Sequence, residues 1–368
     1  MSVHMLPAAQ ALARLGEFDT VIDARSESEY AEDRLPGAVN WPSLNDAERH
    51  EVGTLYKQVS PFDARKRGAA LVAANIARHV AAHVADKPKD WRPLVYCWRG
   101  GQRSGSLALV LGQIGFRVHV VEGGYKAFRS VVLAELPGLA SRFTWRVVCG
   151  PTGSGKTRWL QALAQAGAQV LDLEALASHR SSVLGLIPGQ PQPSQKRFDT
   201  LIWEHLRALD PARPVYVESE SRKVGNVAVP EALIVAMRAA DCIRLELSNE
   251  ERVRLLLEDY AFFTHDRELF CERLGALTAL RGRAQVQAWQ QAVRAGALED
   301  VVRELLARHY DPGYAASTER NFPRFAQAVQ VRPANRSPAA MEAAARELVA
   351  ADQAAAAGAA SSQPTASR

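Results

Sequence analysis

Two short segments of this 368-residue chain combine residue types that bind anions and do chemistry on them. The first, Cys97–Ser104 (CWRGGQRS), follows the apolar run Leu94–Tyr96, and the second, Gly150–Thr157 (GPTGSGKT), follows Val147–Cys149. Each pattern predicts a strand, a tight anion-binding loop and then a helix. One loop offers a thiolate and the other a seat for phosphate. Together they indicate sulfur-type group transfer coupled to a phosphorylated substrate.

The first loop has the composition of an anion nest. Its glycines allow several backbone N–H groups to point inward, and the following helix adds its positive end. Cys97 at the mouth of such a nest is expected to be largely a thiolate, and it is the predicted catalytic residue. The alternative is a buried cysteine that precedes a surface turn. The predicted anion-binding residues are Arg99, Gly100, Gly101, Gln102, Arg103 and Ser104.

The second loop matches the complete phosphate-loop pattern, G-x4-G-K-[ST]. Its backbone N–H groups are expected to wrap a diphosphate, with Lys156 neutralising charge and Thr157 able to hold Mg²⁺. ATP is the default ligand, but the pattern demands only a di- or triphosphate. The alternative is a glycine-rich turn. The predicted diphosphate-binding residues are Gly150, Thr152, Gly153, Ser154, Gly155, Lys156 and Thr157.

Three further residues are predicted to support the second loop. Glu218 ends an apolar strand, where a carboxylate that positions a metal ion or a water would lie. Asp172, together with Glu174, ends another strand and is an alternative for that role. Arg222 lies just beyond Glu218, within reach of a diphosphate or an RNA backbone. Each acid is alternatively a helix cap, and Arg222 is alternatively a solvated surface cation.

The sequence around these loops predicts alternating strands and helices, which would position them. In the first part, strands are expected at Thr20–Ala24, Leu94–Tyr96 and Arg117–Val121, with helices at Gly68–His83 and Ser104–Ile114. This alternation predicts an α/β fold with parallel sheets. A second α/β unit starts near Arg142, and a mostly helical stretch runs from Glu250 to His309. A proline-rich loop at Leu184–Ser194 is expected to close over a ligand.

The length suits two domains rather than one core. The formal net charge of +5 is compatible with a polyanionic partner such as RNA, but it is weak evidence by itself. No run of about 18 apolar residues and no signal peptide is visible, so we expect a cytoplasmic protein without a membrane role. The remaining cysteines, Cys149, Cys242 and Cys271, match neither a zinc site nor a disulfide framework and are expected to pack in cores. No metal site is predicted from them.

The first part of the chain resembles a rhodanese domain. The resemblance rests on Asp23–Arg25, Leu35–Asn40, the Cys97 loop and Val121–Ala127. Its loop holds five residues between the cysteine and the arginine before serine, whereas the usual rhodanese loop holds four. Five is also the spacing of cysteine-dependent phosphatases. The longer loop predicts a wider cradle, suited to a larger anion or atom.

The two domains together resemble the bacterial tRNA 2-selenouridine synthase family over roughly residues 10–330. The matching motifs lie in both domains: Val52–Gln58, Cys97–Ser104, Val121–Tyr125, Gly150–Thr157, Asp172–Arg180, Glu218–Gly225 and Tyr310–Tyr314. The resemblance implies a rhodanese-like domain at 10–138 and a P-loop NTPase-like domain with a helical C-terminal part at 141–335. The Ala-rich composition of 338–368 predicts a final helix and then a disordered tail, so this segment is expected to be partly disordered. We expect a monomer, although the sequence does not fix the oligomeric state.

The resemblance implies a two-step activity on tRNA with 2-thiouridine at the wobble position. A geranyl group from geranyl diphosphate is transferred to the sulfur, and selenium from selenophosphate then replaces the S-geranyl group. No tightly bound cofactor is expected, and Mg²⁺ is a candidate ion. Two alternatives stay open: an ATP-dependent rhodanese-type sulfurtransferase, and a Cys-x5-Arg phosphatase fused to a kinase-like domain.

Overall fold

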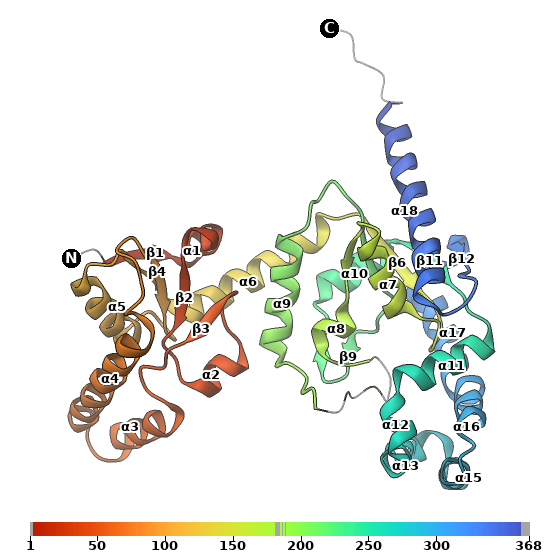
Figure 1. Ribbon diagram of the computed structural model, residues 1–368, viewed down its shortest axis with the longest axis horizontal. Coiled ribbons are helices and arrows are strands. Elements are labelled where there is room, and N and C mark those ends of the chain that lie inside the picture. The colour runs from red at the N-terminus through yellow and green to blue at the C-terminus, as the bar shows by residue number, and fades with distance from the viewer. Residues whose placement is uncertain (1–2, 181–184, 186, 188, 362–368) are drawn as a thin grey trace. The chain divides into compact units, whose positions relative to one another are not determined.

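The computed structural model describes residues 3–180, 185, 187 and 189–361, and the chain divides into two compact units (Figure 1). The first unit comprises Met1–Leu136 together with Pro193–Glu204. The second comprises Pro137–Gln192 and His205–Arg368. The first unit therefore includes a segment that the sequence assigns to the second domain.

The first unit is built on a parallel sheet of five strands, as far as the described residues show. The strand order is β1-β5-β4-β2-β3, so the strand that feeds the Cys97 loop is central. This confirms the predicted α/β class for this part of the chain. The strands are β1 (Val3–Pro7), β2 (Thr20–Asp23), β3 (Ala38–Asn40), β4 (Pro93–Tyr96) and β5 (Val118–Glu122).

Capping residues in the local sequence explain where two helices of the first unit begin and end. Gly115 terminates α5 in the left-handed region, with φ of 116°, which a residue with a side chain rarely adopts. Ser60 caps α4 and Pro61 occupies its first turn, so this helix starts seven residues before the predicted Gly68. The helices are α1 (Ala8–Ala13), α2 (Glu27–Glu32), α3 (Asp46–Gln58), α4 (Pro61–His83), α5 (Gln102–Ile114) and α6 (Gly124–Ser141), with a short 3₁₀ turn at Leu15–Glu17.

The segment Pro193–Glu204 completes the first unit through buried polar contacts. Arg129 forms an ion pair with Asp199, and the Thr200 hydroxyl donates to Asp33 at 3.0 Å. The ring of Trp203 packs edge-on against Phe128 at 5.8 Å between centroids. Sequence periodicity gives no sign of these contacts, because they join residues about 70 to 170 positions apart.

The second unit has its own parallel sheet, with the order β12-β11-β6-β8-β7. The strand that feeds the phosphate loop, β6, is again central. The strands are β6 (Trp145–Cys149), β7 (Gln169–Leu171), β8 (Val215–Glu218), β11 (Asp241–Leu245) and β12 (Val329–Val331), and β9 (Lys223–Val224) pairs antiparallel with β10 (Val227–Ala228).

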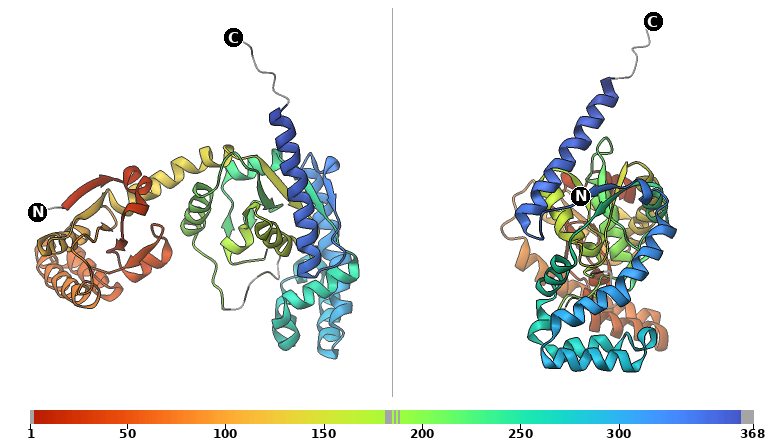
Figure 2. Two further views of the ribbon diagram at one scale, coloured as in Figure 1. Left: turned by 45° about the horizontal axis from the view of Figure 1, so that its top comes forward. Right: turned by 90° about the vertical axis from the view of Figure 1, so that its right-hand side faces the viewer.

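Helices make up most of the rest of the second unit, as the sequence predicts for its C-terminal part. Figure 2 shows α11 to α17 gathered at one end of this unit. The helices are α7 (Lys156–Gln165), α8 (Leu173–Ala177), α10 (Glu231–Ala239), α11 (Asn249–Asp259), α12 (Ala261–His265), α13 (Arg267–Gly275), α14 (Thr278–Arg281), α15 (Arg283–Ala295), α16 (Leu298–Leu305), η2 (Leu306–Tyr310), α17 (Asp311–Asn321) and α18 (Pro338–Ser361), with a short 3₁₀ turn at Phe325–Gln327. Most of α9 (Gln195–Arg207) belongs to the first unit, and only its end, from His205, belongs to the second.

The last helix, α18, belongs to the core of the second unit. Met341, Ala345 and Leu348 are buried against Trp159 and Leu160 of α7. The first part of the Ala-rich segment is therefore packed structure. The expected disordered end of the tail, and part of the predicted loop at Leu184–Ser194, lie outside the described residues. Within the part of the chain that is described, no helix is both long and apolar enough to cross a bilayer.

Candidate active sites

Cys97 lies at the carboxyl end of β4, at the start of the turn that leads into α5. Only 3% of the residue is exposed. Its Sγ accepts a hydrogen bond from the Ser104 hydroxyl at 3.1 Å, and Ser104 is fully buried. Ser104 also lies 3.3 Å from the carbonyl oxygen of Gly101, so its hydroxyl links the sulfur to the middle of the turn. The structure thus brings together the two ends of the predicted loop.

The turn around Cys97 depends on glycines at close backbone approaches. Gly100 has φ of 68°, and a Cβ there would lie 2.8 Å from the carbonyl oxygen of Val121. A Cβ at Gly124 would lie 2.2 Å from the carbonyl oxygen of Cys97. Since both obstacles are backbone atoms, neither position has room for a side chain. The start of α6 therefore forms the floor of the Cys97 loop, and the N–H of Tyr125 donates to the Cys97 carbonyl at 2.8 Å.

The two predicted arginines of this loop have different surroundings. Arg103 donates to the Glu29 carboxylate at 2.8 Å, so its charge is already paired within the unit. Burial works against ionisation of Glu29, but Arg103 and Arg49 outweigh it and hold the pKa of Glu29 below its usual range. Arg99 is exposed, as are Gly101 and Gln102. Arg99 is therefore the loop cation that is open to an incoming anion.

A buried ionic network supports the loop from below. The Asp23–Arg25 pair is fully buried, with 2.6 Å between Nη2 and Oδ2, and the Tyr96 hydroxyl donates to Asp23 at 2.6 Å. The Arg25 guanidinium also lies 4.1 Å from the ring centre of Tyr125. Tyr96 immediately precedes Cys97 and Tyr125 follows the loop floor. The network therefore holds both sides of the loop in place.

The phosphate loop joins β6 to α7 in the predicted manner. Gly153 and Gly155 adopt left-handed conformations, with φ of 78° and 84°. The Lys156 ammonium donates to the carbonyl oxygen of Gly150 at 2.7 Å and so lies folded across the loop. Ser154 is fully buried, and its hydroxyl has no hydrogen-bond partner among the described residues. The remaining predicted loop residues, Thr152 and Thr157, line the same cavity as Lys156.

Hydrogen bonds connect two of the predicted carboxylates to the phosphate loop. Thr157 donates to Glu174 at 3.0 Å, and the backbone N–H of Glu174 donates to Glu218 at 2.8 Å. Burial, reinforced by the nearby charges of Asp172 and other acids, raises the pKa of Glu218 well above its usual value. Asp172 caps α8 by accepting from Ala175 at 2.8 Å, and burial raises its pKa as well.

Arg222 does not line the phosphate-loop cavity. It is exposed and pairs with Glu231 at 2.9 Å. The cavity, about 400 Å³ in volume, is instead lined by two cations outside the predicted site residues, Arg158 and Arg180. Arg158 pairs with Asp259, and the Arg180 guanidinium lies 4.5 Å from the ring centre of Tyr260. Arg158 directly follows the motif Gly150–Thr157, and this adjacency is the sequence signal that points to it.

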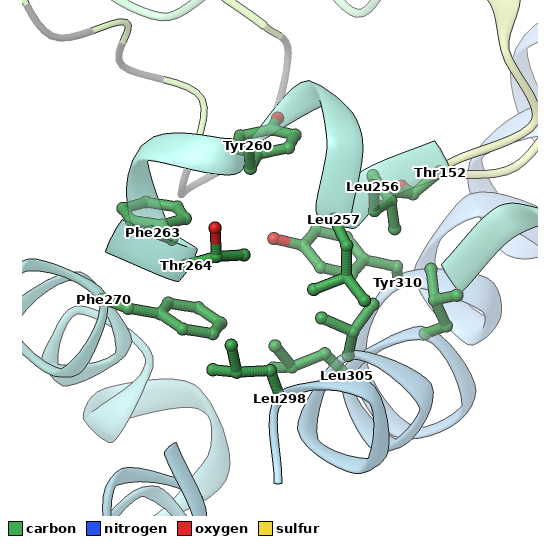
Figure 3. Close-up of a pocket in the computed structure, with 12 residues that line it drawn as sticks. Thr152, Leu256, Leu257, Tyr260, Phe263, Thr264, Phe270, Leu298, Leu305 and Tyr310 are labelled. Atoms are coloured by element: carbon green, nitrogen blue, oxygen red, sulfur yellow. The ribbon is translucent and has the colours of Figure 1, made fainter. Parts of the chain in front are cut away.

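A second, apolar cavity adjoins the phosphate loop (Figure 3). It is narrow, about 50 Å³, and is formed by α11, α12, α13 and α16 with their connecting turns. Figure 3 shows the rings of Tyr310 and Phe270 and the side chains of Leu298 and Leu305 converging on it. Four residues line both cavities: Thr152, Leu256, Tyr260 and Tyr310. The phosphate seat and the apolar cavity are therefore neighbours. The sequence shows no periodic signal for this arrangement.

Comparison with known proteins gives a consistent result over both units. Residues 7–130 match the rhodanese-like domain, and residues 143–282 match the tRNA 2-selenouridine synthase AAA domain. A tRNA 2-selenouridine synthase from Shewanella denitrificans is 31% identical over 349 residues, covering 85% of this chain and 92% of the relative. Relatives with the same name from a Sulfurovum species and from Cupriavidus necator are 32% and 34% identical, covering 83% and 82% of this chain and 90% and 88% of the relatives.

Proposed function

Because the chain belongs to the tRNA 2-selenouridine synthase family, we propose that this enzyme converts 2-thiouridine at the wobble position of tRNA to 2-selenouridine through an S-geranyl intermediate. Geranyl diphosphate and selenophosphate are the proposed co-substrates. The proposal assigns the geranyl step to the second unit and the selenium step to the first.

The observation that carries the geranyl step is the junction between the phosphate loop and the apolar cavity. A prenyl diphosphate has a strongly anionic head and a purely apolar chain. The loop offers backbone N–H groups, Lys156 and the start of α7 for the head. The adjoining cavity offers aliphatic and aromatic side chains for the apolar chain, with Thr152 at the boundary. Its volume of about 50 Å³ holds only the first carbons of the geranyl chain, so the lining side chains must move apart to admit the rest. Burying the chain there is favourable by about 0.8 kcal/mol per methylene group.

The chemistry of this step fits what the loop supplies. The thione sulfur of the base attacks the first carbon of the geranyl group, and the bond from that carbon to the diphosphate oxygen breaks. The proton on N3 of the base is released to the leaving diphosphate. Negative charge then grows on the leaving diphosphate. Lys156, with Arg158 and Arg180 in the same cavity, would stabilise that charge as it develops. Thr157 would hold Mg²⁺ if the step uses the ion, with Glu174 next to it. No hydrolysis of a nucleotide is needed.

The selenium step is assigned to Cys97, with Arg99 as the exposed cation for the phosphate group of selenophosphate. The net exchange balances with one water. Selenium becomes bonded to carbon 2 of the base, geranyl thiol leaves, and the selenophosphate phosphorus leaves as phosphate, so no external oxidant or reductant is required. The resemblance to rhodanese supports Cys97 as the group that handles the chalcogen atom.

The test is mass spectrometry of tRNA nucleosides after incubation with both co-substrates. With Cys97→Ser, we expect S-geranyl-2-thiouridine to accumulate, because the first step is intact and the second is blocked. With Lys156→Ala, we expect 2-thiouridine to remain, because the diphosphate seat is lost. Geranyl transfer that fails in Cys97→Ser but survives in Lys156→Ala would overturn the assignment of steps to units. Unmodified 2-thiouridine with the wild type would overturn the function.

A further inference from the structure

The turn that joins α3 to α4 presents several large apolar side chains to the solvent. We call Tyr56–Arg67 the hairpin tip. Tyr56, Val59 and Phe62 are 57%, 69% and 65% exposed, three large apolar residues within seven positions. Single exposed apolar residues are ordinary on protein surfaces, but a group of them marks an interaction surface. The first part of the tip belongs to the motif Val52–Gln58, to which the proposed reaction assigns no role.

The same tip is basic. It contains Lys57, Arg65, Lys66 and Arg67 against one acid, Asp63. Lys66 pairs with Asp63 and Arg67 with Glu51. In the part of the chain that the structure describes, Lys57 and Arg65 form no ion pair, and both are exposed. Exposed aromatic rings beside free cations are the combination that binds single-stranded nucleic acid, by stacking on bases and contacting phosphates.

The hairpin has a fixed relation to the Cys97 loop because both lie in the first unit. The Ser43 hydroxyl donates to the carbonyl oxygen of Arg103 at 3.1 Å, so the chain just before α3 contacts the start of α5. Asn45 caps α3, and its side chain accepts from Glu48 at 2.8 Å. The thirteen residues of α3 then carry the chain about 20 Å to the tip. At 3.4 Å per stacked nucleotide, this distance is about six nucleotides of one strand.

We propose that the hairpin tip is an RNA-docking surface. Tyr56 and Phe62 stack on RNA, and Lys57 and Arg65 contact phosphates, while a nucleotide about six positions away lies at the Cys97 loop. This inference rests on the proposed function for its RNA substrate. It adds a second point of contact that orients the RNA in the first unit. The net positive charge of the tip favours RNA over a protein partner.

Two double variants test the surface: Lys57→Glu with Arg65→Glu, and Tyr56→Ala with Phe62→Ala. The control, Lys89→Glu with Leu133→Ala, changes an exposed cation and an exposed apolar residue of the same unit that lie outside the tip. Binding is measured with full-length tRNA and with a five-nucleotide RNA centred on 2-thiouridine, at several salt concentrations. The short RNA cannot span from the Cys97 loop to the tip.

We expect each tip variant to weaken binding of full-length tRNA at least tenfold, with no effect on the short RNA. The charge-reversal variant should also reduce the slope of log affinity against log salt by about 2, since two phosphate contacts are lost. The control should bind both RNAs as the wild type does. Equal binding of tRNA by tip variants and wild type would overturn the inference, and so would an equal loss for both RNAs, which indicates damage to the fold. Wild type that binds no tRNA would overturn the proposed function itself.

Discussion

At the scale of single residues, the boundary between phosphate loop and apolar cavity sets which diphosphate is accepted. Leu298 begins α16 and points into the apolar cavity (Figure 3). Leu298→Trp fills space that the geranyl chain needs, so we expect KM for geranyl diphosphate to rise about tenfold, a loss of about 1.4 kcal/mol. Affinity for inorganic diphosphate should stay unchanged, whereas Lys156→Ala should weaken both. Steady-state kinetics and diphosphate titration check this. Parallel losses for both ligands would contradict it.

The raised pKa of Glu218 predicts a pH dependence of the free energy of unfolding. Glu218 is fully buried, and its Oε2 has no hydrogen-bond partner among the described residues. Burial and neighbouring acids raise its pKa well above 4.5. The folded state therefore holds a proton that the unfolded state releases above about pH 4.5, and the Glu218 contribution to the free energy of unfolding falls as pH rises toward the folded pKa. The slope is about 1.4 kcal/mol per pH unit.

Comparison with Glu218→Gln isolates this contribution, because glutamine does not titrate. We expect the variant to gain stability relative to the wild type as pH increases from 4.5 to 8, measured by urea unfolding at each pH. A difference in stability that is independent of pH would refute the raised pKa. A neutral Glu218 also matters for the site, because it limits the negative charge close to a bound diphosphate.

At the scale of elements, the backbone of the first turn of α6 packs directly against the backbone of the Cys97 loop. Gly124→Ala would place a Cβ 2.2 Å from the Cys97 carbonyl oxygen, at a residue whose φ is 57°. We expect a loss of more than about 2 kcal/mol in the free energy of unfolding and loss of the selenium step. Gly138→Ala is the matched control, because it lies in the same helix with open space around it. It should be neutral or stabilising by up to about 1 kcal/mol. Denaturant unfolding of both variants checks this, and similar losses would disprove it.

Elements also show what sequence could and could not predict. Both loops were predictable with their flanking strand and helix, because a buried apolar run, glycines and a helix start are all local signals. The α3–α4 hairpin was only half predicted, since α3 has no fully buried residue and so has weak apolar periodicity. The loop pattern assigns Arg103 to the anion and gives no sign of its ion pair with Glu29, because the two residues are 74 positions apart in the chain. The apolar cavity was not foreseen because its lining comes from four helices and a distant loop.

At the scale of the whole molecule, the C-terminal helix α18 supports the second unit, which carries the phosphate loop. Met341 of α18 packs so closely on the phosphate loop that its Cε lies 2.7 Å from where a Cβ of Gly155 would be. A chain that ends at residue 337 loses this contact and the burial of Leu348 and Val349, at about 1.5–3 kcal/mol for each large apolar side chain.

We expect the chain that ends at 337 to lose diphosphate binding and cooperative unfolding of the second unit. A chain that ends at 354 retains the buried part of α18 and should behave like the full chain. Calorimetry and diphosphate titration of the two truncations provide the check. An unchanged melting temperature for the shorter chain would show that α18 is dispensable.

The discontinuous first unit has a consequence for how the protein is made. Asp33 and Arg129 are synthesised early, but their partners Thr200 and Asp199 lie 64 and 63 residues beyond Leu136, where the first stretch of that unit ends. At about 5–20 residues per second, a ribosome needs about 3–13 s to supply them. During that interval the nascent rhodanese-like unit carries buried polar groups without their partners. Slow codons or a pause between residues 137 and 193 would lengthen the period in which a chaperone or a protease can engage it.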